Sequence, residues 1–233
     1  MPRARGTPAV AAAAALPTAA PVRPAPPYWD EARRHLTKRD RVMSKLIAGS
    51  GDIFLQSRGD AFTTLARSIV GQQISVRAAQ AVWDRFAALA DGADAPRLAP
   101  ASVLRLEVEA MRKAGLSARK VDYLSDLAKH FESGAVHVAD WQSMDDEAIV
   151  DELVAIRGIG RWTAEMFLIF HLMRPNVLPL DDVGLVHGVS LNYFSGEPVS
   201  RSDLREVAVA WAPYCSVATW YIWRSLDPLP VAY

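Results

Sequence analysis

The residues best suited to chemistry are an acidic pair, Asp181-Asp182, and two glycines that precede it in the chain. Gly158 and Gly160 flank a single apolar residue, Ile159, between two stretches with apolar residues at helical spacing, which predicts two helices joined by a very tight hairpin. Glycine lets a phosphate approach the main chain because no Cβ intervenes, and the second helix begins there with unpaired N–H groups at the positive end of its dipole. The hairpin is therefore a candidate phosphate-binding site made of backbone.

The acidic pair is expected at the start of a further helix. Pro179 ends the segment after the second hairpin helix, and an apolar run begins at Val183. A carboxylate at a helix N-terminus is stabilised by the helix dipole. Both aspartates are therefore candidates for a catalytic carboxylate, although an isolated pair of this kind is more often a simple helix cap.

The elements that must position these residues are predicted to be helices. Apolar residues at three- and four-residue spacing predict helices over 31–48, 61–70, 76–89, 119–131, 147–156, 161–172, 183–193, 202–211 and 215–226. Strand patterns are nearly absent, so the expected class is all-α. The expected N-caps are Ser75, Ser117 and Ser202, helix ends are expected near Gly115 and Gly134, and the longer loops are expected around 91–101 and 174–180.

Composition limits the class of protein. The chain has 233 residues, of which 51% are hydrophobic, so it can bury a full core as one domain or as two lobes that share one. Lys+Arg and Asp+Glu each number 26, and this zero net charge gives no compositional support for nucleic-acid binding, so any attraction must be local. Residues 1–27 are rich in alanine and proline and are expected to be a disordered tail before a folded domain at 28–233.

Cysteine and histidine usage argues against a metal cluster. Cys215 is the only cysteine, which excludes an intramolecular disulfide and a four-thiolate iron–sulfur cluster. The histidines show no i, i+4 pairing of metal-site type, so zinc is not expected.

Together these motifs resemble the helix-hairpin-helix DNA glycosylase superfamily and, within it, the DNA-3-methyladenine glycosylase II group of alkylation-repair enzymes. The matching features are the hairpin, Tyr28-Trp29-Asp30, Ile69-Val70-Gly71-Gln72-Gln73-Ile74-Ser75, Gly115-Leu116-Ser117-Ala118-Arg119-Lys120, Leu178-Pro179-Leu180-Asp181-Asp182 and Trp211-Ala212-Pro213-Tyr214. The resemblance implies two helical lobes around a cleft, with the hairpin and the aspartate at its mouth and no N-terminal β-domain.

The resemblance also implies an activity: a monofunctional DNA glycosylase that flips and excises alkylated purines. Asp182 is followed after two residues by aliphatic Leu185, as in the family, so the resemblance makes Asp182 the candidate catalytic carboxylate and leaves Asp181 as the candidate N-cap. Asp182 would stabilise positive charge on the sugar or orient the attacking water. A purine alkylated at N3 or N7 is cationic and leaves without a general acid, so one carboxylate suffices. Superfamily members that also cut the strand carry a lysine where this chain has Trp162; without that amine no imine forms, and an abasic site is the expected product.

Further site residues follow from the same resemblance. The candidates for the base pocket are Trp162, Tyr214, Trp220 and Trp223, whose π-faces attract a cationic base, although an aromatic core is the open alternative. The expected DNA contacts are Gly158, Ile159, Gly160, Thr163, Gln72, Gln73 and Ile74, with Gln73 or Ile74 as the wedge that fills the gap left by the flipped nucleotide. Main-chain carbonyls of Val154, Ile156 and Ile159 would hold a sodium or potassium ion, and no other cofactor is expected.

The expected partner is double-stranded DNA that contains alkylated bases. We expect a monomer with no membrane partner, located with the nucleoid in a bacterial cytoplasm or in a eukaryotic nucleus. Three alternatives stay open from sequence: a glycosylase for mismatched, oxidised or deaminated bases, a non-enzymatic helix-hairpin-helix DNA-binding module, and a helical protein–protein adaptor.

Overall fold

The computed structural model describes residues 25–57, 59–90 and 97–226, and every regular element in these ranges is an α-helix. The all-α prediction is confirmed for the part of the chain that the structure describes. None of its helices is long and apolar enough to cross a membrane. The helices are α1 (Trp29–Arg39), α2 (Arg41–Gly49), α3 (Ala61–Gly71), α4 (Val76–Ala90), α5 (Pro100–Leu104), α6 (Val108–Lys113), α7 (Ala118–Glu132), α8 (Asp146–Val154), α9 (Arg161–Phe170), α10 (Val183–Tyr193), α11 (Arg201–Ala208) and α12 (Cys215–Leu226).

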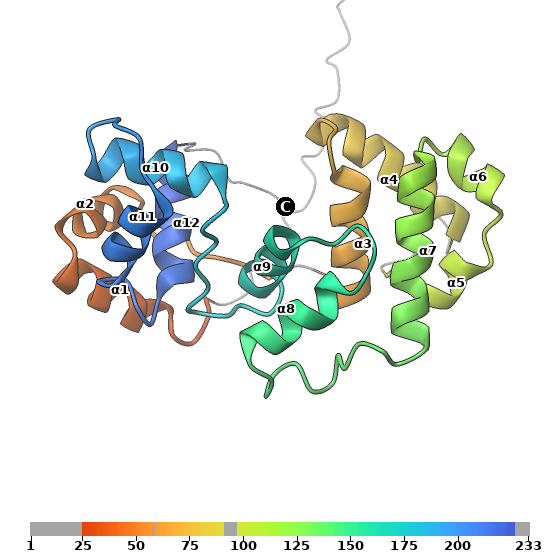
Figure 1. Cartoon of the computed structure of the whole chain (residues 1–233), viewed down its shortest axis with the longest axis horizontal. Helices are drawn as coiled ribbons and strands as arrows, with labels where there is room; N and C mark the ends of the chain where they lie inside the picture. The colour runs from red at the N-terminus through yellow and green to blue at the C-terminus, as the bar shows by residue number, and fades with distance from the viewer. Residues whose placement is uncertain (1–24, 58, 91–96, 227–233) are drawn as a thin grey trace, which may run out of the picture.

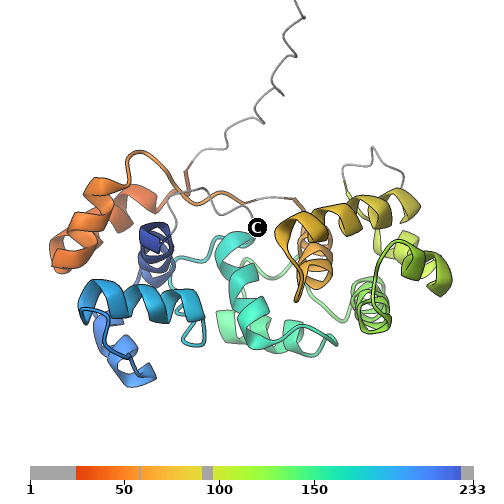
Figure 2. The same cartoon turned by 90° about the horizontal axis from the view of Figure 1, so that it is seen from above.

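The helices form two lobes, as predicted (Figures 1 and 2). One lobe is built from both ends of the described chain, because α1 and α2 pack against α12, which packs in turn against α10. The other lobe contains α3 to α9, and α7 packs on α3, α5 and α6. The helices α8 and α9 contact each other and lie between α3 and the first lobe (Figure 1). The cleft expected between the lobes stays a prediction.

Asp40, a buried polar residue, links the two ends of the described chain within the first lobe. Asp40 lies between α1 and α2, and its Oδ2 accepts hydrogen bonds from Tyr193 Oη at 2.6 Å and Trp211 Nε1 at 3.0 Å. The carboxylate and the two donors are thereby satisfied in a site that is largely closed to water. The surrounding buried side chains belong to one hydrophobic cluster that extends through both lobes, and each large one contributes about 1.5–3 kcal/mol by leaving water.

Asp40 also explains the first departure from the sequence prediction. A continuous helix over 31–48 was expected, but Asp40 has extended backbone angles, and its Oδ1 accepts from Val42 N at 2.8 Å and Met43 N at 3.0 Å. It therefore ends α1 and caps α2. The short helices α5 and α6 were missed, because five or six residues carry too little periodicity for a helix to be predicted.

The predicted caps are confirmed with one exception. The hydroxyls of Ser75 and Ser117 accept from Ala78 N and Lys120 N, each at 3.3 Å. Ser202 was wrong, because Ser200 caps α11 in a reciprocal capping box with Asp203. Gly115 and Gly134 follow α6 and α7 with positive φ, as expected at helix ends. The tail expected at 1–27 lies outside the described residues up to residue 24.

Candidate active site and DNA-binding surface

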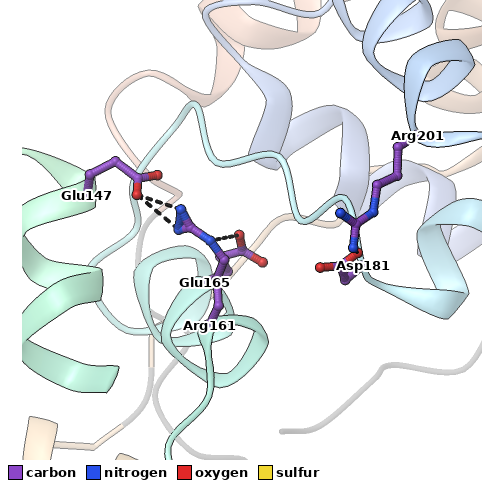
Figure 3. Close-up of polar contacts among 5 residues, drawn as sticks. All are labelled: Glu147, Arg161, Glu165, Asp181 and Arg201. Carbon is purple, nitrogen blue, oxygen red and sulfur yellow. Dashed lines mark hydrogen bonds and ion pairs between the residues drawn. The ribbon is translucent and has the colours of Figure 1, made fainter. Parts of the chain in front are cut away.

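Asp182 is the N-cap of α10 and is almost fully buried, with 7% of its surface exposed. Its Oδ1 accepts a hydrogen bond from Leu185 N at 2.6 Å, and its extended backbone lets the chain enter the helix at Val183. The prediction that Asp181 is the N-cap was therefore wrong by one residue. Asp181 points elsewhere and forms an ion pair with Arg201 at the start of α11 (Figure 3).

Two indole groups hold the Asp182 carboxylate from opposite lobes. Trp223 of α12 donates its Nε1 proton to Oδ1 at 2.7 Å, and Trp162 of α9 donates its Nε1 proton to Oδ2 at 2.8 Å. Oδ1 thus accepts two hydrogen bonds, from Trp223 and from the amide of Leu185, whereas Oδ2 accepts one from Trp162 and retains acceptor capacity. Trp162 is 42% exposed, so it forms the solvent-facing side of this arrangement. The carboxylate is oriented before any substrate binds.

Gly184, which was not predicted as a site residue, makes room for this geometry. A Cβ on Gly184 would lie 3.2 Å from Asp182 Oδ1 and 3.2 Å from Trp223 Cδ1, which is closer than side-chain carbons normally approach. Trp223 is fixed from another direction by Phe170, whose ring stacks on it at 5.6 Å. A glycine in the first turn of a helix, where it lowers helix propensity, was the available signal.

The four aromatic residues predicted for the base pocket fall into two pairs. Trp162 and Trp223 contact Asp182, as described above. Tyr214 stacks on Tyr28 with ring centroids 6.5 Å apart, and Trp220 meets Trp29 edge to face at 5.3 Å, so both contact residues at the start of the described chain. The structure thus places two of the four at the carboxylate, and a pocket role for all four stays a prediction.

The hairpin joins α8 to α9, as predicted, but its two glycines have different environments. Gly158 has φ +86°, and a Cβ there would lie 2.2 Å from the ring of Tyr123. Gly160 is the N-cap of α9, and a Cβ there would meet nothing within 4 Å. The open approach expected for a phosphate therefore exists at Gly160, whereas Gly158 is required by its backbone angle and by Tyr123.

The neighbouring candidate DNA contacts can be sorted by exposure. The Ile159 side chain is buried, so only its main chain is available to DNA. Thr163 lies on the first turn of α9 and is half-buried. The hairpin and the first turn of α9 thus offer backbone N–H groups at a helix N-terminus, which suits an anion.

The turn between α3 and α4 contains the other predicted DNA contacts. Gln72 does not face outward, because its Nε2 donates to Gly158 O at 2.9 Å. Gln73 is exposed and has φ +60°, which is uncommon for a residue other than glycine. Ile74 is 40% exposed. Gln73 and Ile74 stay the wedge candidates, and Gln72 instead connects their turn to the hairpin.

A set of charged residues beside the hairpin was not predicted (Figure 3). Arg161, the first residue of α9, contacts Glu147 at 2.6 Å and Glu165 at 3.9 Å. Burial raises the pKa of Glu165, the charge of Arg161 opposes the rise, and the charges of Asp181, Glu147 and Asp182 add to it, so that the pKa is about 7. Glu165 is consequently part-protonated near neutral pH. The i, i+4 spacing of Arg161 and Glu165 was the sequence signal for part of this set.

The carbonyls proposed for a cation lie where the last turn of α8 enters the hairpin. Carbonyl groups at a helix C-terminus lack intrahelical partners and face the negative end of the dipole, so oxygen donors of this kind fit a hard cation. Ile156 O accepts from Ile159 N at 3.1 Å and keeps a second lone pair. Val154 is the last residue of α8 and is exposed.

These features define a class of protein: a two-lobed helical protein whose hairpin presents a helix N-terminus to an anion next to a carboxylate held between its lobes. A family model described as HhH-GPD superfamily base excision DNA repair protein matches residues 66–213. The match covers more than half of the chain, which therefore belongs to the HhH-GPD superfamily.

Individual relatives agree with this assignment. The chain is 30% identical to DNA-3-methyladenine glycosylase 1 of Schizosaccharomyces pombe, over 84% of this chain and 86% of that protein. A crystal structure of a DNA-3-methyladenine glycosidase from Bacillus halodurans is 35% identical and superposes with a TM-score of 0.78, over 84% of this chain and 89% of that one. The S. pombe 3-methyladenine DNA glycosylase, solved in complex with abasic DNA, is 27% identical with a TM-score of 0.72, over 87% and 99%. Other curated relatives are longer, and the chain spans 59% and 57% of two from Bacillus subtilis.

Proposed function

We propose that the protein is a DNA glycosylase that hydrolyses the N-glycosidic bond of alkylated purines, such as 3-methyladenine and 7-methylguanine, and so begins base excision repair. The observation that carries the proposal is the Asp182 carboxylate, fixed by a helix N-terminus and two indole donors in a chain of this superfamily. The partner is double-stranded DNA bound by a single copy of the protein. The names of the relatives above support this substrate class.

The geometry supports a simple mechanism. The hairpin binds a backbone phosphate through main-chain N–H groups, and the damaged nucleotide leaves the base stack. The bond between C1′ and the purine nitrogen breaks, and its electron pair neutralises the cationic base. Asp182 stabilises the positive charge that develops on the sugar, and water adds to C1′ and loses a proton. Since Oδ2 keeps acceptor capacity, it is the oxygen that faces this step.

A preference for cationic bases follows from the same residues. The aromatic faces of Trp162 and Trp223 next to the carboxylate favour a cationic base over a neutral one by about 0.5–2 kcal/mol. Tyr214 and Trp220 are proposed to complete the pocket from the side of α1. Burial raises the pKa of Tyr28, on which Tyr214 stacks, to about 12, so this side carries no phenolate charge at neutral pH.

We further propose that the enzyme cuts no DNA strand. Trp162 stands where bifunctional relatives carry the imine-forming lysine, and its indole nitrogen is committed to Asp182. A sodium or potassium ion at the carbonyls of Val154, Ile156 and Ile159 would add positive charge beside the phosphate, and no other cofactor is proposed.

A panel of duplexes tests the function. Each duplex carries one modified base, and released base is measured under single-turnover conditions. We expect 7-methylguanine and 3-methyladenine to be released faster than hypoxanthine or uracil, and the strand to stay intact until it is heated in alkali. Faster release of uracil than of any alkylpurine would favour a mismatch-type glycosylase, no release would favour a binding module, and a protein–DNA adduct trapped by borohydride would contradict the monofunctional reaction.

A further inference from the structure

One side of α7 contacts both segments that are expected to touch DNA. Lys120 Nζ donates to Val70 O at 2.7 Å and to Gln72 O at 2.8 Å, at the end of α3 and the start of the wedge turn, which we define as residues 71–75. Three residues further along, the Tyr123 ring lies against Gly158 of the hairpin. These contacts place one helix behind the wedge turn and the hairpin together.

Two further hydrogen bonds complete the connection. Asp126, three residues after Tyr123, accepts from Arg157 N of the hairpin at 2.8 Å through its Oδ2. Gln72 Nε2 donates to Gly158 O at 2.9 Å and joins the wedge turn directly to the hairpin. The wedge turn, the hairpin and α7 are therefore linked pairwise, and none of them can shift without breaking a hydrogen bond.

The positive charge of Lys120 suits its position at the C-terminal end of α3. The last carbonyls of α3 lack intrahelical partners and lie at the negative end of the helix dipole, where a cation is stabilising. Gln72 O belongs to the peptide group that leads into Gln73, whose φ of +60° is costly for a residue with a side chain. The hydrogen bond of Lys120 to Gln72 O holds this peptide group, and its bond to Val70 O holds the end of α3, so together they oppose relaxation of the turn. Lys120 is half-buried, and this partial burial lowers its pKa.

We propose that Lys120 is a positioning residue for base flipping, which fixes the exposed Gln73-Ile74 tip at a set distance from the phosphate-binding hairpin. The inference rests on the proposed glycosylase function and adds a named residue to it. Lys120 touches neither the base nor the sugar in this scheme. It acts only through the wedge turn, so its contribution is confined to lesions that must be flipped out of a paired stack.

The experiment compares one lesion in two settings. Single-turnover release of 7-methylguanine is measured in a fully paired duplex and in the same duplex with the lesion inside a bubble of unpaired bases. We expect Lys120→Met to slow release from the paired duplex about tenfold, because the charge-assisted hydrogen bonds to Val70 O and Gln72 O are lost, and to change release from the bubble less than about twofold. Lys120→Arg, which keeps the charge and two donors, should restore most of the paired rate. Arg119→Met removes the same charge from an exposed neighbour and should leave the ratio of the two rates unchanged.

Two outcomes would overturn the proposal. Equal losses from paired and bubble substrates would show a general structural or chemical defect. Weaker binding to undamaged duplex, with a salt dependence reduced by about one phosphate contact, would show that Lys120 binds DNA directly.

A second readout keeps the inference testable without chemistry. Fluorescence of 2-aminopurine next to an abasic-site analogue reports insertion of the wedge, and Lys120→Met should reduce the change on binding whereas Arg119→Met should not. If wild-type protein releases no alkylated base, the proposed function fails by itself, while this fluorescence still decides the role of Lys120. Thermal denaturation shows whether each variant is folded. If Lys120→Met does not fold, Lys120→Arg serves as the informative variant.

Discussion

The Asp182 site and the hairpin are adjacent in the fold but are held together in different ways. The partners of Asp182 come from α9, α10 and α12, so both lobes contribute to the carboxylate's orientation. The partners of the hairpin and the wedge turn come from α3 and α7, inside one lobe. The helix α9 belongs to both regions, because its N-terminus completes the hairpin and its Trp162 donates a hydrogen bond to Asp182. DNA binding therefore depends on one intact lobe, whereas catalysis also depends on how the two lobes are placed relative to each other.

The largest effect should come from neutralising the carboxylate. We expect Asp182→Asn to reduce single-turnover release of 7-methylguanine by about 100-fold or more while duplex affinity stays within about twofold, because the stabilisation of the sugar cation is lost and the hairpin is untouched. Excision assays beside a binding titration measure the difference.

Asp181→Asn is the matched control. Its partner Arg201 is exposed, and an exposed ion pair contributes at most about 1 kcal/mol, so activity should change little. Normal excision by Asp182→Asn, together with loss in Asp181→Asn, would move the catalytic role to the neighbouring residue.

Substitutions of the two hairpin glycines should have different effects on protein stability and on duplex binding. Gly158→Ala forces a side chain into the left-handed region and into Tyr123, so we expect it to cost more than about 1 kcal/mol of stability and to weaken all duplexes alike. Gly160→Ala should fold with less than about 1 kcal/mol of loss, since its Cβ meets nothing, and should weaken duplex binding without regard to sequence. Chemical denaturation and binding titrations on several sequences test this, and a sequence-selective loss would argue against a phosphate contact.

The indole hydrogen bonds can be tested apart from the aromatic faces. Trp162→Phe and Trp223→Phe keep a ring and remove one N–H donor to Asp182. We expect each to slow excision about tenfold, the effect of losing a hydrogen bond to a charged group, with little change in lesion affinity. A change in affinity with an unchanged excision rate would instead assign both residues to base stacking alone.

The smallest effect concerns Glu165 and pH. Its folded-state pKa of about 7 lies above its ordinary value of 4.5, so the folded protein binds this proton more tightly than the unfolded chain. The stability that this proton contributes is complete below about pH 4.5 and is lost as pH rises through about 7. We expect Glu165→Gln to raise the melting temperature at pH 8 by on the order of 2–4 °C and to have almost no effect at pH 5. Equal shifts at both pH values would exclude titration of Glu165 as the cause.

Local signals made much of this structure predictable. The start of α10 at Val183 and the hairpin between α8 and α9 follow from glycine, proline and helical periodicity. The acidic pair was placed at the helix start, but which aspartate caps depends on backbone angles that neighbouring residue types do not determine. The break at Asp40 was missed because its side chain can cap a helix or lie on its surface, and only tertiary contacts with Tyr193 and Trp211 decide between these.

Contacts between residues far apart in the chain could not be predicted from the sequence. Trp162 and Trp223 lie 20 and 41 residues from Asp182, and Lys120 lies 48 residues from Gln72. The aromatic side chains of the two tryptophans predicted a base pocket, but their indole N–H groups donate hydrogen bonds to the Asp182 carboxylate. Lys120 belongs to a segment that matched the family, but nothing in that segment shows that its ammonium group meets the carbonyls of Val70 and Gln72.

The lobe built from both ends of the chain has a consequence for the order of folding during synthesis. Contacts within α3 to α9 are available as soon as those helices leave the ribosome, whereas Asp40 must wait for Trp211, 171 residues later. A nascent chain that ends at α9 can already present its hairpin and wedge turn, but α1 and α2, which pack on each other, still lack α12, and Asp182 has not yet been made. Among the described residues, the reactive centre is therefore assembled last, when α12 brings Trp223 to the carboxylate.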